Sequence, residues 1–183
     1  TLTTGNGNIT YTQTGANNDL LLGTVSADLV DDIVTIVTAG AIDASAANAT
    51  AEIAAATINL TTTAEGIGQG ANGAVDINAV TILNANSTGT AISIDDIVGN
   101  LPIGLVTAGT DGAAVTLTSV GAITDADGAD VAADDILAGV LTLTAVTGIG
   151  SGEELEIDAT TLNATNNAIT GVFVANHIDI TDS

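Results

Sequence analysis

The stretch Gly121–Gly150, GAITDADGADVAADDILAGVLTLTAVTGIG, decides the fold because most of its parts occur twice in the chain. The earlier segment Gly40–Gly68 contains the same GAI, then an apolar-polar-apolar triplet and then the same GIG. A long internal period that holds several short apolar segments is typical of repeat architectures. The sequence therefore predicts stacked copies of one structural unit.

The spacing between the two copies is nearly constant. Val34–Ile42 matches Val115–Ile123 at an offset of 81 residues, and Gly66–Gly68 matches Gly148–Gly150 at an offset of 82. Small changes in the offset indicate insertions in turns. The copies span roughly residues 31–94 and 112–180, and we expect a single β-solenoid body over residues 1–183.

Apolar and polar residues alternate within the repeated segments, which is the period of a β-strand. The flanking positions hold Val, Ile or Leu, and the middle positions are polar in all triplets but one, so each short strand has a dry and a wet face. The exception is Phe173, which predicts either an outward aromatic contact or a local change of register. The triplets begin at Ile9, Val34, Ile58, Val75, Ile92, Val115, Leu141, Leu155, Val172 and Ile178.

Turn-forming clusters of Gly, Asn, Asp, Ser and Thr separate these strands. Such a series can form a sandwich, a barrel or a solenoid, and the internal repeat favours the solenoid, in which each coil covers the apolar edge of its neighbour. We therefore predict an all-β parallel β-helix with about 20 to 25 residues per coil. An antiparallel β-sandwich is the alternative fold. A helix over Ala44–Thr57 is a local alternative, since Ala is the best helix former.

The composition narrows the function classes. The 183 residues include no Lys, no Arg and no Cys, against 22 Asp and Glu, so salt bridges and disulfides are absent. The chain is nevertheless 46% hydrophobic, which favours a folded protein over an acidic disordered one. Nucleic acid is excluded as a partner because phosphate binding depends on Lys and Arg. No apolar run approaches the roughly 20 residues that a membrane helix needs, so we expect no membrane insertion.

The pattern GAITDADGADVAADDILAGVLTLTAVTGIGSGEELE, which begins at Gly121, resembles the long repeats of large bacterial surface proteins, the filamentous-haemagglutinin-like and autotransporter-type adhesins. The similarity covers Gly112–Ile180, and the weaker first copy over Asp31–Ile94 extends it. This first copy departs from the pattern because it lacks the acidic loop and has Asp43 where the second copy has Thr124. The resemblance implies a right-handed parallel β-helix that is extracellular or on the cell surface, and it brings no catalytic residues.

These features predict a structural segment or subunit of an extracellular fibre, sheath or adhesin rather than an enzyme. We expect self-association end to end into fibres, and a cell-surface glycan is a candidate partner. A glycan- or ice-binding module is the alternative, suggested by outward Thr rows at Thr35, Thr116 and Thr142. The acids Asp76, Glu156 and Asp179 interrupt these Thr rows. A polysaccharide-degrading enzyme fits less well, because such enzymes generally hold acidic sugars with Lys and Arg, which this chain lacks.

The candidate ion site is the loop that holds Asp125, Asp127 and Asp130 around Gly128. Hard cations such as Ca²⁺ favour closely spaced carboxylates of this kind, although the loop lacks the length and terminal Glu of an EF-hand. The plain alternative is a solvated acidic turn. Because the chain has no Lys or Arg, bound cations are the available relief for the repulsion among its carboxylates, so we expect Ca²⁺ here. Secondary candidates are Asp31, Asp32, Asp95, Asp96, Asp134, Asp135 and the pair Glu153 and Glu154.

Overall fold

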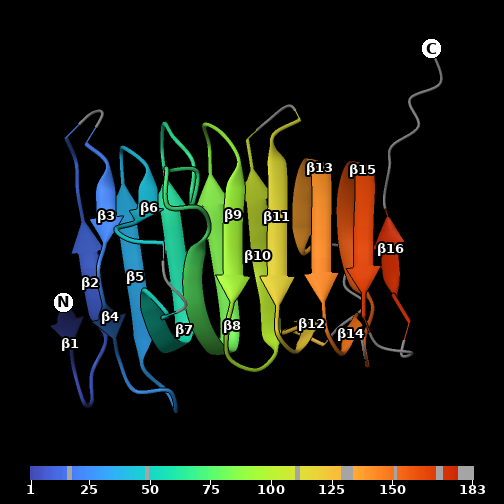
Figure 1. Ribbon diagram of the computed structural model, residues 1–183, viewed down its shortest axis with the longest axis horizontal. Helices are drawn as coiled ribbons and strands as arrows, with labels where there is room; N and C mark the ends of the chain where they lie inside the picture. The colour runs from blue at the N-terminus through green and yellow to red at the C-terminus, as the bar shows by residue number, and fades with distance from the viewer. Residues whose placement is uncertain are drawn as a thin grey trace.

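The computed structural model describes residues 1–15, 18–47, 50–109, 112–128, 134–150, 152–167 and 171–176. In this part of the chain the regular structure is entirely β, and no helix is present (Figure 1). The helix alternative over Ala44–Thr57 is therefore wrong, since strands occupy both ends of that segment. The strands are β1 (Leu2–Thr3), β2 (Ile9–Thr12), β3 (Leu20–Leu22), β4 (Val25–Ser26), β5 (Ile33–Thr38), β6 (Ile42–Ala44), β7 (Ile53–Thr62), β8 (Val75–Ser87), β9 (Ile92–Asp96), β10 (Leu101–Ala108), β11 (Ala114–Ser119), β12 (Ala122–Asp125), β13 (Ile136–Ala145), β14 (Gly148–Ile149), β15 (Leu155–Asn166) and β16 (Val174–Asn176).

All the strand pairings among the described residues are parallel. Ile9 pairs with Val34, Val34 with Ile58, and Ile58 with Leu83, so each of the first coils advances by 24 or 25 residues. Each coil thus lays a new strand beside the one before it, as Figure 1 shows from β2 to β16. The all-β parallel β-solenoid is confirmed, and the antiparallel sandwich is wrong.

Long strands carry the chain around a corner of the coil. Ile53, near the start of β7, pairs with Val25 of β4, whereas Ile58, further along the same strand, pairs with Val34 of β5. One continuous strand therefore contributes to two faces of the solenoid. The strands β8 and β13 likewise exchange partners or shift register part-way along their length.

The long sequence repeat does not equal a whole number of coils. Ile42 stacks through Ile67 and Ile92 onto Val115, which is the repeat equivalent of Val34 and not of Ile42. The repeat equivalent of Ile42 is Ile123, which belongs instead to the column that leads from β5 through β7, β8 and β10. Equivalent sequences in the two copies therefore lie on different faces of the solenoid.

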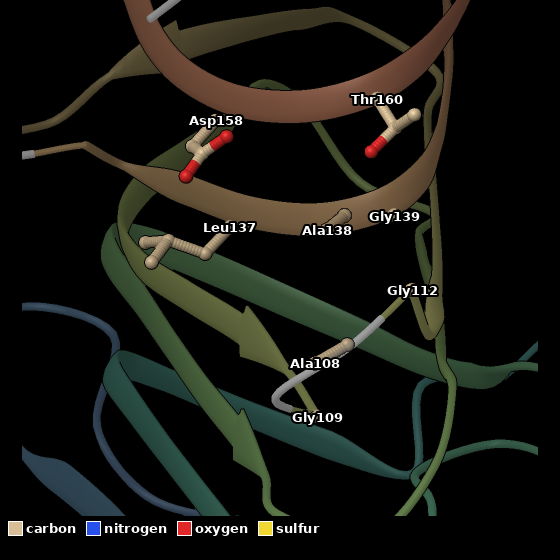
Figure 2. A pocket seen from close by; sticks show the side chains of 8 residues that line it. All are labelled: Ala108, Gly109, Gly112, Leu137, Ala138, Gly139, Asp158 and Thr160. Carbon is tan, nitrogen blue, oxygen red and sulfur yellow. The ribbon is translucent and has the colours of Figure 1, made fainter. Parts of the chain in front are cut away.

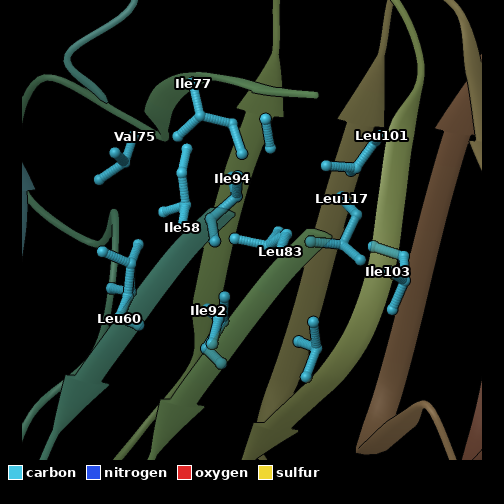
Figure 3. Close-up of a cluster of buried hydrophobic side chains, with 14 of the residues drawn as sticks. Ile58, Leu60, Val75, Ile77, Leu83, Ile92, Ile94, Leu101, Ile103 and Leu117 are labelled. Carbon is cyan, nitrogen blue, oxygen red and sulfur yellow. The ribbon is translucent and has the colours of Figure 1, made fainter. Parts of the chain in front are cut away.

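Most of the described flanking residues of the triplets belong to one buried core that extends from Ile9 to Ala159. Figure 3 shows its middle part, where side chains such as Ile58, Leu83 and Ile94 stack strand on strand. Burial of an Ile or Leu side chain contributes about 1.5–3 kcal/mol, so stacking stabilises a fold whose sequence contains no Lys or Arg for ion pairs. Phe173 is exposed over about half of its surface. The strand pairing changes at this residue, since Val172 pairs with Ile149 and Val174 with Leu155, as the predicted local change of register requires.

Polar side chains also link neighbouring coils on the outer surface. Asn84 Nδ2 donates to Asn59 Oδ1 over 2.9 Å, and Asn59 Nδ2 donates to Thr35 Oγ1 over 3.3 Å. Asn84 Oδ1 in turn accepts the backbone N–H of Leu105 at 2.9 Å. The wet face predicted from the alternation is therefore partly occupied by hydrogen bonds that run along the solenoid.

Candidate metal centre

Three carboxylates from distant parts of the second copy converge on the solenoid. Asp125 ends β12, Asp135 immediately precedes β13, and Glu156 lies in β15. One carboxylate oxygen of each lies within 4.8 Å of the other two. We call Asp125, Asp135 and Glu156 the carboxylate cluster. Within the described residues, this cluster is the group of at least three His, Cys, Asp or Glu side chains that lie close enough together to share a metal ion.

The path of the chain beside β10 explains why the two aspartates meet. Asp125 pairs with Ile103 of β10, and Ile136 pairs with Val106 of the same strand. Asp125 and Asp135 therefore both lie beside β10, at the two ends of the acidic segment 126–134. This segment is thus framed by carboxylates.

Glu156 is held against Asp135 by a pair of hydrogen bonds between adjacent coils. The Asp135 N–H donates to the Glu156 carbonyl over 2.7 Å, and the Glu156 N–H donates to Asp135 Oδ2 over 3.1 Å. Glu156 is only 5% exposed, although it occupies the middle of a triplet and was expected to face water. Its Oε2 atom is buried and has no hydrogen-bond partner among the described residues.

The loop backbone orients the third carboxylate. Asp125 Oδ1 accepts the N–H of Asp127, and Asp125 Oδ2 accepts the N–H of Gly128, each at 2.9 Å. Asp125 is half-buried, whereas Asp127 is exposed and lies outside the cluster. Asp130, the remaining predicted primary ligand, lies outside the described residues.

Negative charge is concentrated at this point. Burial, together with the nearby carboxylates of Asp125, Glu156 and Asp127, raises the pKa of Asp135 to about 7, against the lowering effect of the hydrogen bond from the Glu156 N–H. No Lys or Arg exists in the chain to compensate these charges. Carboxylate oxygens grouped at this separation are the ligands that Ca²⁺ and Mg²⁺ accept.

The first copy contains the same acidic pair without the third carboxylate. Glu52 and Asp76 are the repeat equivalents of Asp135 and Glu156. The Glu52 N–H donates to the Asp76 carbonyl over 2.7 Å, and the Asp76 N–H donates to Glu52 Oε2 over 2.8 Å, which reproduces both bonds of the second copy. Burial raises the pKa of Glu52 and that of Asp76.

The third carboxylate of the cluster depends on one position at which the two copies differ. Aligning Ile42 with Ile123 places Ala44 where the second copy has Asp125, and both residues end their strands. The acidic pair is therefore part of the repeated scaffold, and Asp125 is the addition. The sequence singled out Asp125 as a candidate ligand, whereas it gave no sign of Glu156, because the triplet of Glu156 matches an ordinary strand.

The secondary candidates in the first copy do not form a comparable group. Asp31 is exposed, and the neighbouring Asp32 is buried with its carboxylate accepting the N–H of Gly7 at 2.6 Å and that of Asp28 at 3.3 Å. Asp32 thus links two coils through backbone N–H groups. That arrangement stabilises the turn and explains why this acid is buried.

Asp95 and Asp96 follow each other in β9 but face different environments. Asp95 pairs with Asp76 on the outer surface, whereas Asp96 is 1% exposed. Asp134 is half-buried beside Asp135 and is not part of the cluster. Glu153 and Glu154 line a separate shallow pocket beside Phe173.

A groove of about 250 Å³ lies where β13 and β15 bend (Figure 2). Gly139 brings the backbone of β13 onto that of Gly112, because a Cβ at Gly139 would overlap the Gly112 backbone. Asp158 and Thr160 of β15 provide the polar side chains of the wall. Asp158 is the single ionisable side chain among the described lining residues, so they do not supply the pair of acids that general acid and base catalysis by carboxylates uses.

No protein-family model matches the chain, and no curated protein or solved structure is significantly similar to it. The resemblance to adhesin repeats therefore rests on the quoted residues alone. Among the described residues there is also no helix of the length and apolarity required to cross a membrane.

Proposed function

We propose that the chain is a structural segment or subunit of an extracellular fibre, sheath or adhesin and that it stacks end to end. The observation that carries this proposal is the apolar surface of the first coil. Leu2, Tyr11 and Leu21 are 49%, 39% and 63% exposed there. They line an apolar pocket of about 250 Å³ that reaches the core residues Ile9 and Ile36.

The backbone of the same coil supports strand addition. Within the described residues β1 pairs with β4 alone, β2 with β5 alone and β3 with β6 alone, so three strands have a free edge. A free parallel edge with apolar side chains is a template for another strand. We assign the C-terminal coil of a second copy, which contains β15 and β16, as its occupant.

Location and partners follow from the same proposal. The resemblance to adhesin repeats supports an extracellular or cell-surface location, and a cell-surface glycan remains a candidate partner of the fibre. The acidic surface supports end-to-end stacking as well. Its 22 carboxylates, with no Lys or Arg among them, make the sides of neighbouring solenoids repel each other. Association would then be directed to the coil ends.

Combining Thr3→Pro with Leu21→Gln should abolish assembly while preserving the fold. Leu2 and Thr4 donate their N–H groups to β4, so the N–H of Thr3 is directed to the free edge, where Pro removes a donor without breaking an existing bond. Leu21→Gln removes exposed apolar surface. Electron microscopy and sedimentation at high protein concentration measure assembly, and Val80→Gln on the side of the solenoid, 52% exposed, is the control.

The wild-type protein and Val80→Gln should form rods longer than one solenoid, and the double variant should remain monomeric with an unchanged circular dichroism spectrum. Isolated wild-type monomers under all these conditions would contradict the proposal, as would equal assembly of the double variant.

A second candidate function, surface binding to ice or to a glycan, is favoured by one observation. Thr118, Thr144 and Thr165 are in register on three adjacent strands, and Thr116 and Thr142 form a parallel row two positions away. Asp95 ends the first row on the N-terminal side. Thermal hysteresis of the purified protein, lost in Thr142→Val and Thr144→Val, would support ice binding, and its absence in the wild-type protein would contradict it.

A further inference from the structure

We propose that Asp125, Asp135 and Glu156 bind one Ca²⁺ ion, which fastens both ends of the acidic loop to strand β15 of the next coil. This inference does not depend on fibre assembly, because the three ligands belong to one chain. It uses neither Asp127 nor any residue outside the described part of the loop.

The separation of the three carboxylates fits a shared ion. Protein oxygens bind Ca²⁺ at 2.3–2.6 Å, so two ligands of the same ion are at most about 5 Å apart. The carboxylate oxygens of the cluster lie within 4.8 Å of one another and satisfy this limit without rearrangement of the backbone. Ca²⁺ also tolerates irregular coordination completed by water, whereas Mg²⁺ requires nearly ideal octahedral geometry.

The unpaired oxygen of Glu156 is an independent observation that points to a ligand. An acidic group with no partner is costly when it is buried, because it loses its hydration and gains no hydrogen bond. Glu156 is 95% buried and its Oε2 has no partner among the described residues, although its carboxylate faces two others. A divalent cation supplies both the missing partner and the charge compensation.

The chain itself offers no other source of positive charge at this point. It contains no Lys or Arg, and the side chains whose charges raise the pKa of Asp135 are all carboxylates. Three carboxylates in contact in a partly buried place repel each other strongly unless a cation lies between them. The first copy avoids this repulsion by having Ala44 at the third position, and it therefore serves as an internal control.

The decisive experiment compares Glu156→Gln with Asp76→Asn, which makes the same change at the equivalent residue of the first copy. Calcium binding is measured by isothermal titration calorimetry in 0.15 M salt, and melting temperatures are measured in Ca²⁺ and in EDTA. The wild-type protein and Asp76→Asn should show one saturable site above the weak background of surface acids. Glu156→Gln and Asp125→Asn should lower the affinity of that site at least about tenfold, consistent with the loss of one charged ligand.

Melting temperatures keep the test independent of folding defects. In EDTA, Glu156→Gln should be at least as stable as the wild-type protein, because it replaces a buried unpaired charge by a neutral group of the same size. In 1 mM Ca²⁺ the order should reverse, because only the wild-type protein gains stability from ligand binding.

Three outcomes would overturn the proposal. The first is the absence of a saturable site in the wild-type protein, which would show diffuse counterions only. The second is an equal effect of Glu156→Gln and Asp76→Asn on calcium affinity. The third is equal stabilisation by Mg²⁺ at the same concentration, which would remove calcium as the ion. Each result is obtained on monomeric protein and is therefore distinguishable from a failure of end-to-end assembly.

Discussion

In EDTA, the melting temperature of the protein should fall as the pH rises from 5 to 8, and Asp96→Asn should remove a large part of that fall. Asp96 is 1% exposed at the end of β9. Its Oδ1 accepts only a long bond of 3.4 Å from the N–H of Val98, and its Oδ2 is buried without a partner among the described residues. Burial raises the pKa of this carboxyl to about 7.

The direction of the effect follows from proton binding. In the unfolded chain Asp96 loses its proton near pH 4, whereas in the folded protein it keeps the proton up to about pH 7. Between these values unfolding releases a proton, so the folded state loses stability as the pH rises and the loss is complete above the folded pKa. Between pH 5 and 8 this amounts to about 2–3 kcal/mol for Asp96, which corresponds to roughly 5–10 °C for a chain of this size.

Thermal melts of the wild-type protein and Asp96→Asn at both pH values measure the effect. Asparagine keeps the acceptor for the Val98 N–H and cannot ionise, so Asp96→Asn should lose less stability than the wild-type protein over this range. Asp31→Asn, at an exposed site, controls for the removal of one negative charge. A fall of equal size in Asp96→Asn and the wild-type protein would show that Asp96 does not carry the dependence. Glu52, Asp76 and Asp135 have pKa values raised by burial and contribute in the same direction.

The parallel solenoid could be predicted from the sequence because two simple regularities coincide. The alternation in segments such as Val34-Thr35-Ile36 gives the strand, and the recurrence of GAI and GIG shows that strands are stacked rather than folded back. Both regularities can be read directly from the printed sequence. The exchange of faces between the copies was not predictable in this way, because it depends on how many residues each coil between Ile42 and Ile123 contains.

The candidate site was predicted only in part, for a related reason. Sequence adjacency suggested that Asp125 acts with Asp127 and Asp130, whereas in the structure its nearest acidic partners are Asp135 and Glu156. These partners are brought together by stacking, which places residues of neighbouring coils side by side. A period of two also predicts Glu156 to face water, and nothing in its triplet reveals that it is buried instead.

Gly68→Ala should destabilise the protein far more than Gly73→Ala, although both glycines have positive φ values, 65° and 90°. At Gly73 an added Cβ meets no atom within 4 Å, so alanine incurs only the left-handed backbone penalty of about 1–2 kcal/mol. At Gly68 the Cβ would lie closer than 3.0 Å to the carbonyl oxygen of Ser93 in the next coil. The expected total loss at Gly68 is roughly 3–5 kcal/mol.

The neighbouring coils cannot move apart to relieve that overlap. The Gly68 N–H donates to the Ile42 carbonyl and the Ser93 N–H donates to the Ile67 carbonyl, each over 2.8 Å, so Gly68 is fixed between the preceding and following coils. Gly150, the repeat equivalent of Gly68, has φ 63° and approaches the carbonyl of Phe173 in the same way. The final glycine of each GIG is thus required where one coil rests on the next, and equal losses of unfolding free energy in chemical denaturation of Gly68→Ala and Gly73→Ala would contradict this explanation of the repeat.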